Sequence, residues 1–346
     1  MSKIAMLTSL VSVYMPEAVV KLFNPNRDTY RGEMIDPKAF ALGRLANHLR
    51  DGAQMPTIAE SRAQLTQTAK LFDTKAPALA RIEDIQVDGA DGPVKARLYS
   101  DEPNISNLRP AMIYYHGGGF IQGDLESHHE VCAKLAKWSG AIVVAVDYRL
   151  APEFPYPAGV DDAIAAYQYV VENSKALGVD GNMVGVGGDS AGGCFAAVVA
   201  QQASQSGGPV PKFQVLIYPV TDGNLNSQSI NELEHAYILP KARMSWYRDQ
   251  YAGEFKDYDD PKFSPIKAEN LSGQPDAYIV TGGFDPLVDD GTDYAKKLDE
   301  AGVATVHRHF PGQVHAFVNL TRVVPEGTVA LREIAAWISA KISANS

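Results

Sequence analysis

The sequence lacks the features that nucleic-acid-binding, disulfide-stabilised and membrane-spanning proteins need. It has 31 basic against 41 acidic residues, a formal net charge of -10, so no basic surplus is available to neutralise phosphates. Its two cysteines, Cys132 and Cys194, are far apart and are expected to be buried small side chains rather than a disulfide or thiolate metal site. No apolar run approaches the roughly 20 residues of a membrane span. We therefore expect no nucleic-acid partner and no stable membrane insertion.

The N-terminus has a weak likeness to a secretory signal. Residues 3–13 combine one lysine with an apolar stretch, but no small-x-small cleavage pattern precedes Pro16. We expect these residues to form a helix that packs on the body of the protein. A cytoplasmic location is the corresponding expectation.

From Arg81 onward, short apolar runs alternate with longer helical segments. The strand candidates are 82–87, 94–99, 111–115, 141–146, 183–187, 213–218, 277–281 and 305–310. The helix candidates are 126–139, 159–177, 190–206, 293–301 and 326–342. This alternation predicts an α/β fold with a mostly parallel, eight-stranded sheet covered by helices on both faces.

Two segments fall outside this alternation. Residues 1–76 show a helical pattern broken by prolines and no strand pattern, and Thr57 and Glu60 are spaced as a capping box. An aromatic-rich stretch at about 221–260 interrupts the strand–helix order. We expect a helical cap at 1–76, a main domain at 77–346, and a cap insertion at about 221–260 that meets the N-terminal helices. An ordinary helix pair in the core is the alternative for the insertion.

A Gly-x-Ser-x-Gly turn at 188–192 stands between an apolar strand and an alanine-rich helix. This is the context of a nucleophile elbow, in which Ser190 occupies the strained tip with its oxygen exposed. Gly188 and Gly192 lie where a Cβ atom would collide with the neighbouring backbone. The alternative is a glycine-rich turn with an incidental serine.

A nucleophilic hydroxyl needs backbone donors for the oxyanion that it creates. Three glycines follow His116 at the end of the strand at 111–115, so consecutive N–H groups can face one point. Ala191, directly after the nucleophile, would add its own N–H. A phosphate-binding or purely structural glycine turn is the alternative, although the sequence has no Walker motif.

The same serine needs a base and an orienting acid. Asp285 follows the strand at 277–281, with Asp289 and Asp290 as competitors that are better placed to start the next helix. Among eight histidines, His315 follows the last predicted strand. The order Ser190, Asp285, His315 is that of α/β-hydrolases.

Several motifs together resemble the hormone-sensitive-lipase-like branch of the α/β-hydrolases, which includes many microbial carboxylesterases. They are His116-Gly117-Gly118-Gly119, Asp147-Tyr148-Arg149-Leu150-Ala151-Pro152-Glu153, Pro155-Tyr156-Pro157-Ala158, Gly188-Asp189-Ser190-Ala191-Gly192-Gly193, Asp285-Pro286-Leu287 and His315. The resemblance spans roughly residues 80–340. A small departure is Ala316, where the family usually has glycine.

The resemblance implies an α/β-hydrolase fold and a role for each motif. Ser190 would be the nucleophile, His315 the general base and acid, and Asp285 the orienting acid. Gly117, Gly118 and Ala191 would form the oxyanion hole. No cofactor or metal is implied, and relatives often pair as homodimers through the sheet edge near the last strand.

The motifs and the resemblance together predict a serine carboxylic ester hydrolase that works through an acyl-enzyme. The resemblance also implies short- to medium-chain acyl esters, because a helical cap usually bounds the pocket in this family. The substrate-binding residues cannot be assigned from the motifs. An amidase, carbamate or lactone hydrolase would use the same triad. A non-catalytic ligand receptor on a hydrolase scaffold would have lost a triad member, usually the histidine.

Overall fold

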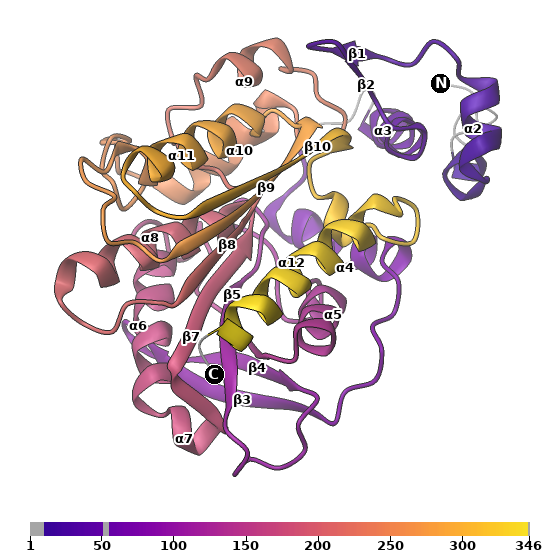
Figure 1. The fold of residues 1–346 in the computed structure, drawn as a ribbon. Helices are drawn as coiled ribbons and strands as arrows, with labels where there is room; N and C mark the ends of the chain where they lie inside the picture. Colours follow the sequence, from indigo (N-terminus) through magenta and orange to yellow (C-terminus); the bar gives the residue numbers. More distant parts are fainter. Residues whose placement is uncertain (1–9, 51–54, 345–346) are drawn as a thin grey trace.

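A computed structural model describes residues 10–50 and 55–344, and its centre is an eight-stranded sheet, drawn in Figure 1. The strand order is β10-β9-β8-β7-β5-β6-β4-β3. All neighbours are parallel except for β3 with β4 and β4 with β6, which are antiparallel. The predicted α/β fold with a mostly parallel eight-stranded sheet is confirmed.

The strands have the following bounds: β1 Thr29–Tyr30, β2 Glu33–Met34, β3 Arg81–Gly89, β4 Gly92–Ser100, β5 Arg109–Tyr115, β6 Ile142–Asp147, β7 Val179–Asp189, β8 Phe213–Ile217, β9 Asp276–Phe284 and β10 Thr305–Val314. The helices have the following bounds: α2 Glu17–Phe23, α3 Pro37–Arg50, α4 Ile58–Phe72, α5 His129–Ser139, α6 Ala158–Glu172, α7 Ser174–Leu177, α8 Ala191–Ser206, α9 Gln228–Glu232, α10 Lys241–Ala252, α11 Val288–Glu300 and α12 Glu326–Ala344, with short 3-10 turns η1 Pro265–Lys267 and η2 Phe317–Asn319.

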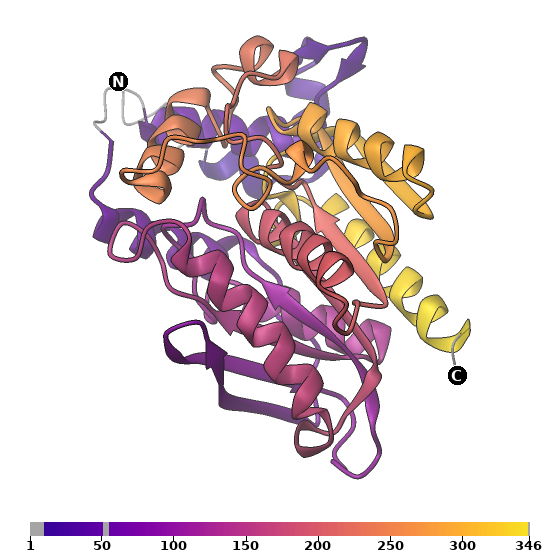
Figure 2. The ribbon, with the colours of Figure 1, turned by 90° about the vertical axis from the view of Figure 1, so that its left-hand side faces the viewer.

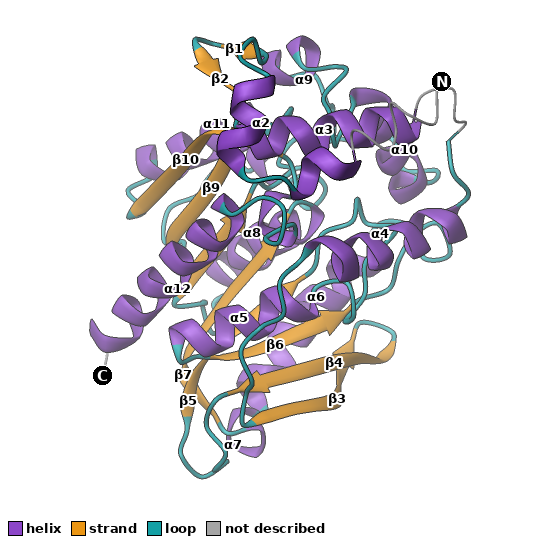
Figure 3. Cartoon of the chain, turned by 90° about the vertical axis from the view of Figure 1, so that its right-hand side faces the viewer, coloured by secondary structure: helices purple, strands orange, loops and turns teal. Residues whose placement is uncertain are grey.

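Helices cover both faces of the sheet because its central strands are apolar on both sides. Strand β5 is buried throughout residues 111–115, and all of β8 is buried. Helices α6, α8 and α11 pack on one face (Figure 2). Helices α5 and α12 pack on the other face (Figure 3). The two hydrophobic cores therefore lie above and below one sheet, as expected for parallel strands.

The N-terminal segments and the segment containing α9 and α10 lie at the same end of the sheet (Figure 1). The Arg50 guanidinium donates to the backbone carbonyls of Tyr237 and Ile238, and the Tyr30 hydroxyl donates to Glu232 at 2.7 Å. These contacts join the first 76 residues to the 221–260 stretch. The division into a cap, a main domain and a cap insertion stays our interpretation of that arrangement.

One element in the N-terminal region was not expected. Strands β1 and β2 form a small antiparallel hairpin, with Thr29 opposite Met34. Two-residue strands are too short to produce the alternation by which strands are recognised in a sequence. The capping box is confirmed: the Thr57 side chain accepts from the Glu60 N–H, and the Glu60 carboxylate accepts from the Thr57 N–H.

Two other expectations concern the cysteines and the chain start. Cys132 and Cys194 are both free and buried, as predicted. No helix in the described part of the chain has the length and apolar character to cross a bilayer. Most of the signal-like stretch at 3–13 lies outside the described residues, which begin at residue 10.

Candidate active site

Ser190 lies at the tip of a sharp turn between β7 and α8. Its backbone angles are φ 55° and ψ −117°, a strained conformation for a residue with a side chain. A Cβ atom on Gly192 would lie 1.8 Å from the Tyr115 carbonyl oxygen, and one on Gly188 would lie 2.4 Å from the Gly192 carbonyl carbon. The two glycines therefore allow the turn that exposes the serine oxygen.

The imidazole of His315 lies between the hydroxyl of Ser190 and the carboxylate of Asp285. Its Nε2 atom is 3.0 Å from Ser190 Oγ, and its Nδ1 atom is 2.7 Å from Asp285 Oδ2. Asp285 is fully buried, and its other oxygen accepts the N–H of Leu287 at 2.9 Å. Three residues from the ends of three different strands are thus brought within hydrogen-bonding reach.

The competing carboxylates lie elsewhere. Asp289 pairs with Arg31 and accepts the Ser229 N–H at 2.8 Å. Asp290 is buried and accepts the N–H groups of Thr221 and Asp222. Both residues lie in the first turn of α11, where carboxylates suit the helix dipole.

The glycine loop after β5 differs from our expectation at its first position. The N–H of Gly117 donates to Asp189 Oδ1 at 2.9 Å, so it is occupied in this structure. Gly118 and Gly119 have φ angles of 127° and 60°, which glycine adopts without strain. Within the described residues, no acceptor pairs with the N–H of Gly118, Gly119 or Ala191. Of the four N–H groups of Gly117, Gly118, Gly119 and Ala191, only that of Gly117 is thus paired within the described residues.

Asp189 is the centre of a buried polar cluster beside Ser190. Its carboxylate accepts the hydroxyl of Tyr114 at 2.8 Å, and it lies 3.4 Å from His128 Nε2 and 3.3 Å from Asn319 Nδ2. Burial by itself would raise the pKa of Asp189, but the charge of His128 and the hydrogen bonds from His128, Tyr114 and Gly117 lower it to about 2. A carboxylate held ionised in this way fixes the groups around it.

Three members of this cluster were not found by sequence reasoning. Tyr114, His128 and Asn319 belong to separate segments, and none of them forms a local motif with Asp189. His116, which precedes the three glycines, stacks on Tyr148 with a 4.3 Å centroid separation. Only the folded structure brings Tyr114, His128 and Asn319 to Asp189, so the sequence carries no local signal for them.

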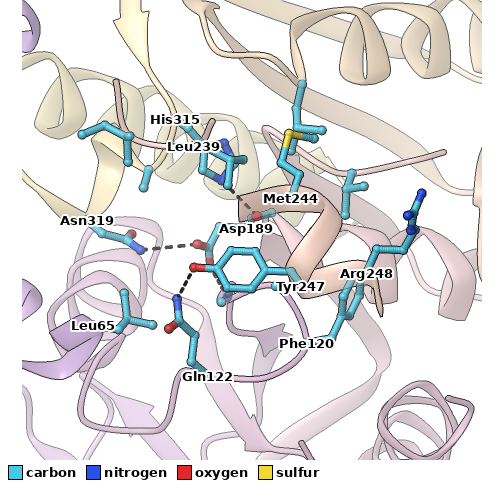
Figure 4. A pocket seen from close by; sticks show the side chains of 18 of the residues that line it. Leu65, Phe120, Gln122, Asp189, Leu239, Met244, Tyr247, Arg248, His315 and Asn319 are labelled. Carbon is cyan, nitrogen blue, oxygen red and sulfur yellow. Dashed lines mark hydrogen bonds between the residues drawn. The ribbon is translucent and has the colours of Figure 1, made fainter. Parts of the chain in front are cut away.

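A cavity of about 160 Å³ opens over Ser190 and His315 (Figure 4). Most of its lining is apolar, and much of it comes from the 221–260 stretch. The apolar lining residues are Leu65, Phe120, Val220, Leu225, Ile238, Leu239, Met244, Phe263, Leu287 and Ala316. The described residues contain no group of three or more histidine, cysteine, aspartate or glutamate side chains placed to hold a metal. The cavity suits a small apolar molecule that presents one polar group to Ser190.

The chain is similar in sequence to proteins of known family. A family model described as the alpha/beta hydrolase fold matches residues 112–319. Esterase LipI of Mycobacterium tuberculosis is 42% identical over 253 residues, covering 72% of this chain and 79% of that protein. The ethyl acetate hydrolase of Pseudomonas putida is 36% identical over 277 residues, covering 79% of this chain and 86% of that protein.

Solved structures are also similar. An ester hydrolase from the metagenome of Lake Arreo matches with a TM-score of 0.85 and 37% identity, over 89% of this chain and 99% of that one. A hyperthermophilic esterase from the archaeon Pyrobaculum calidifontis matches with a TM-score of 0.81 and 39% identity, over 86% of this chain and 97% of that one. These matches confirm the family resemblance that the motifs indicated.

Proposed function

The chain belongs to the alpha/beta hydrolase fold family, and on that premise we propose that it hydrolyses carboxylic esters with Ser190 as nucleophile. The observation that carries the proposal is the His315 imidazole, 3.0 Å from Ser190 Oγ and 2.7 Å from Asp285 Oδ2. A histidine in this position can take the serine proton while the buried carboxylate orients its ring. The relatives named as esterases support the same reaction class.

The reaction follows from the positions of these groups. Ser190 Oγ attacks the ester carbonyl carbon as His315 Nε2 accepts its proton. His315 then donates that proton to the departing alcohol, which leaves the acyl group on Ser190. A water molecule, deprotonated by His315, attacks the acyl-enzyme and releases the acid, and the proton returns to Ser190. Asp285 stabilises the imidazolium in both half-reactions.

The tetrahedral oxyanion would be bound by the N–H groups of Gly118, Gly119 and Ala191. Gly118 and Ala191 were expected in this role, whereas Gly119 replaces Gly117, because the Gly117 N–H already donates to Asp189. Loss of one such donor typically costs about 3 kcal/mol of transition-state stabilisation.

The proposed substrates are small esters with short to medium acyl chains. The catalytic cavity of about 160 Å³ and its apolar lining support this range. The relative from Pseudomonas putida is named for ethyl acetate, one of the smallest esters.

Hydrolysis of p-nitrophenyl acetate, butyrate and decanoate by the wild type and by Ser190→Ala tests the proposal. We expect the acetate and butyrate to be cleaved by the wild type and the variant to lose at least about a thousandfold in kcat. Ser204→Ala, which removes a hydroxyl further along α8, is the matched control and should keep its activity. Equal rates for the wild type and Ser190→Ala would overturn the assignment.

The alternatives that share the triad are separable with a substrate panel. Amides, carbamates and lactones with leaving groups of matched reactivity would be compared with esters. A preference for one of those classes would replace the ester proposal. Tight binding of a small ligand without turnover would instead indicate a receptor.

A further inference from the structure

A second cavity lies against the catalytic one and shares a wall with it. It has a volume of about 270 Å³, compared with about 160 Å³ for the catalytic cavity. The residues that line both cavities are Leu65, Gln122, Ile238, Tyr247, Ala316 and Asn319. A change in that wall would therefore connect the two spaces.

The centre of the wall is a hydrogen-bonded pair of side chains. Gln122 Nε2 donates to the Tyr247 hydroxyl at 3.0 Å, and the two side chains point toward each other (Figure 4). The Ser61 hydroxyl donates to Gln122 Oε1, so both ends of the amide are paired. Ser61 lies on α4, Gln122 follows the glycine loop and Tyr247 lies on α10, so three distant segments meet here.

Tyr247 is held in position from the other side as well. A Cβ atom on Gly119 would lie 2.4 Å from Tyr247 Cγ, which places the ring directly against the glycine loop. The Arg243 guanidinium lies over the same ring, 5.8 Å from its centroid. The ring thus has little room to move while the Gln122 bond is intact.

The second cavity is built mainly of apolar side chains from α3 and α4. Its apolar residues away from the shared wall are Leu42, Leu45, Ala46, Leu49, Ala69, Phe72 and Leu320. A lining of this kind suits an alkyl chain, whose transfer from water is favourable at each buried methylene. Because the second cavity adjoins the site that would hold an ester, an alkyl chain that reaches this cavity would belong to that ester.

We propose that the Gln122–Tyr247 pair is a partition that limits the alkyl chain length of the substrate, and that the cavity behind it accepts longer chains once the partition is removed. This inference rests on the proposed ester hydrolysis at Ser190. The group that would enter the second cavity is an alkyl chain, which can belong to either the acyl or the alcohol side of the ester.

The primary variant is Tyr247→Ala, with Tyr247→Leu as a second variant should the first fail to fold. The measurement is the ratio of kcat/KM for p-nitrophenyl decanoate to that for p-nitrophenyl butyrate. Removal of the ring should raise this ratio by about tenfold or more. The same comparison with decyl and butyl acetate distinguishes the alcohol side from the acyl side, and a rise in either series supports the partition.

Two control variants separate the wall from other effects of the substitution. Tyr247→Phe keeps the ring and removes only the hydroxyl. Its decanoate-to-butyrate ratio of kcat/KM should therefore stay closer to that of the wild type than the ratio of Tyr247→Ala does. Ala46→Phe fills the second cavity from α3, where Ala46 is only partly buried. Added to Tyr247→Ala, it should cancel the gain for long chains, while by itself it should leave the wild-type ratio unchanged.

A binding measurement decides the partition independently of turnover. Ser190→Ala and Ser190→Ala/Tyr247→Ala would be titrated calorimetrically with 2-hexanone and 2-decanone, which resemble esters but are not hydrolysed. The proposal expects the double variant to gain affinity for 2-decanone relative to 2-hexanone. Unchanged ratios in both the kinetic and the binding series would overturn the partition. Loss of the ester-hydrolase assignment itself would appear as equal rates for wild type and Ser190→Ala, and the ketone affinities would then still decide the partition.

Discussion

The carboxylate of Asp189 accepts the backbone N–H of Gly117 at 2.9 Å, which ties the residue before the nucleophile to the first glycine of the oxyanion loop. Strands β7 and β5 are neighbours, so the end of one lies beside the end of the other. The proposed nucleophile and the glycine loop that would bind the oxyanion are therefore positioned by one shared contact rather than independently.

Replacement of Asp189 tests this contact. Asp189→Ala leaves the Gly117 N–H and the Tyr114 hydroxyl without their partner, which should cost about 2–3 kcal/mol of stability. It should also lower kcat by about tenfold to a hundredfold because the glycine loop loses its anchor, with KM less affected. Enzyme kinetics and urea unfolding measure the two effects. Asn319→Ala removes a 3.3 Å contact at the other carboxylate oxygen and a 3.1 Å contact with His128 Nε2, but it leaves the Gly117 bond in place. An equal loss of kcat in that control would contradict the role of the Gly117 bond.

The buried histidine at the start of the glycine loop predicts a loss of stability in acid. Burial, together with the charge of His128, lowers the pKa of His116 to about 4, from an ordinary value of 6.5. Between these two pKa values the unfolded chain binds a proton at His116 that the folded chain does not. The contribution of His116 to the free energy of unfolding is therefore complete above about pH 7 and is lost as the pH falls toward 4. The loss should be about 3 kcal/mol.

Urea unfolding at pH 7, 5.5 and 4 measures this effect. His116→Asn should make the fall in stability over this range smaller, whatever its own stability at pH 7. His235→Asn is the control, since the His235 side chain is 92% exposed. If the stability of His116→Asn falls with pH as steeply as that of the wild type, His116 is not the source of the acid destabilisation.

Two adjacent glycines in the nucleophile elbow should respond differently to alanine. A Cβ atom at Gly192 would lie 1.8 Å from the Tyr115 carbonyl oxygen, so Gly192→Ala must displace β5 or the elbow itself. We expect it to cost about 3 kcal/mol and most of the activity. At Gly193 the nearest atom is Pro219 Cβ at 3.0 Å, and Gly193→Ala should change stability by less than about 1 kcal/mol. Thermal unfolding of both variants measures the difference, and similar losses would contradict this account of the elbow.

Breaking a buried ion pair on α5 should cost far more stability than breaking a more exposed one on the same helix. Lys134 Nζ lies 2.5 Å from Asp73 Oδ1, and both side chains are almost fully buried. Lys134→Met leaves the buried Asp73 carboxylate hydrogen-bonded to Thr74 and Thr321 but without its counter-ion, and should cost about 3 kcal/mol. Lys137 pairs with Asp101 where both side chains are at least one-third exposed, so Lys137→Met should cost less than about 1 kcal/mol. Urea denaturation of the two variants tests this, and equal costs would show that burial is not the reason.

The fold was predictable because its signals are local. Apolar runs such as 111–115 and 141–146 indicate strands buried on both faces, and helical segments between strands require a parallel sheet. The nucleophile elbow was also local, because Gly188, Ser190 and Gly192 form a contiguous pattern. The β1–β2 hairpin could not be predicted, since two residues do not make a pattern.

The chain order and the motifs were enough to nominate Ser190, Asp285 and His315, because residues at the carboxyl ends of parallel strands meet at one edge of the sheet. The replacement of Gly117 by Gly119 among the proposed donors, the Asp189 cluster and the Gln122–Tyr247 wall were decided by the tertiary structure alone. Each depends on which side chain from a distant segment occupies a given N–H or fills a given gap. Hydrogen bonds and packing act over a few ångströms of space, and neighbours at that range can be more than a hundred residues apart in the chain.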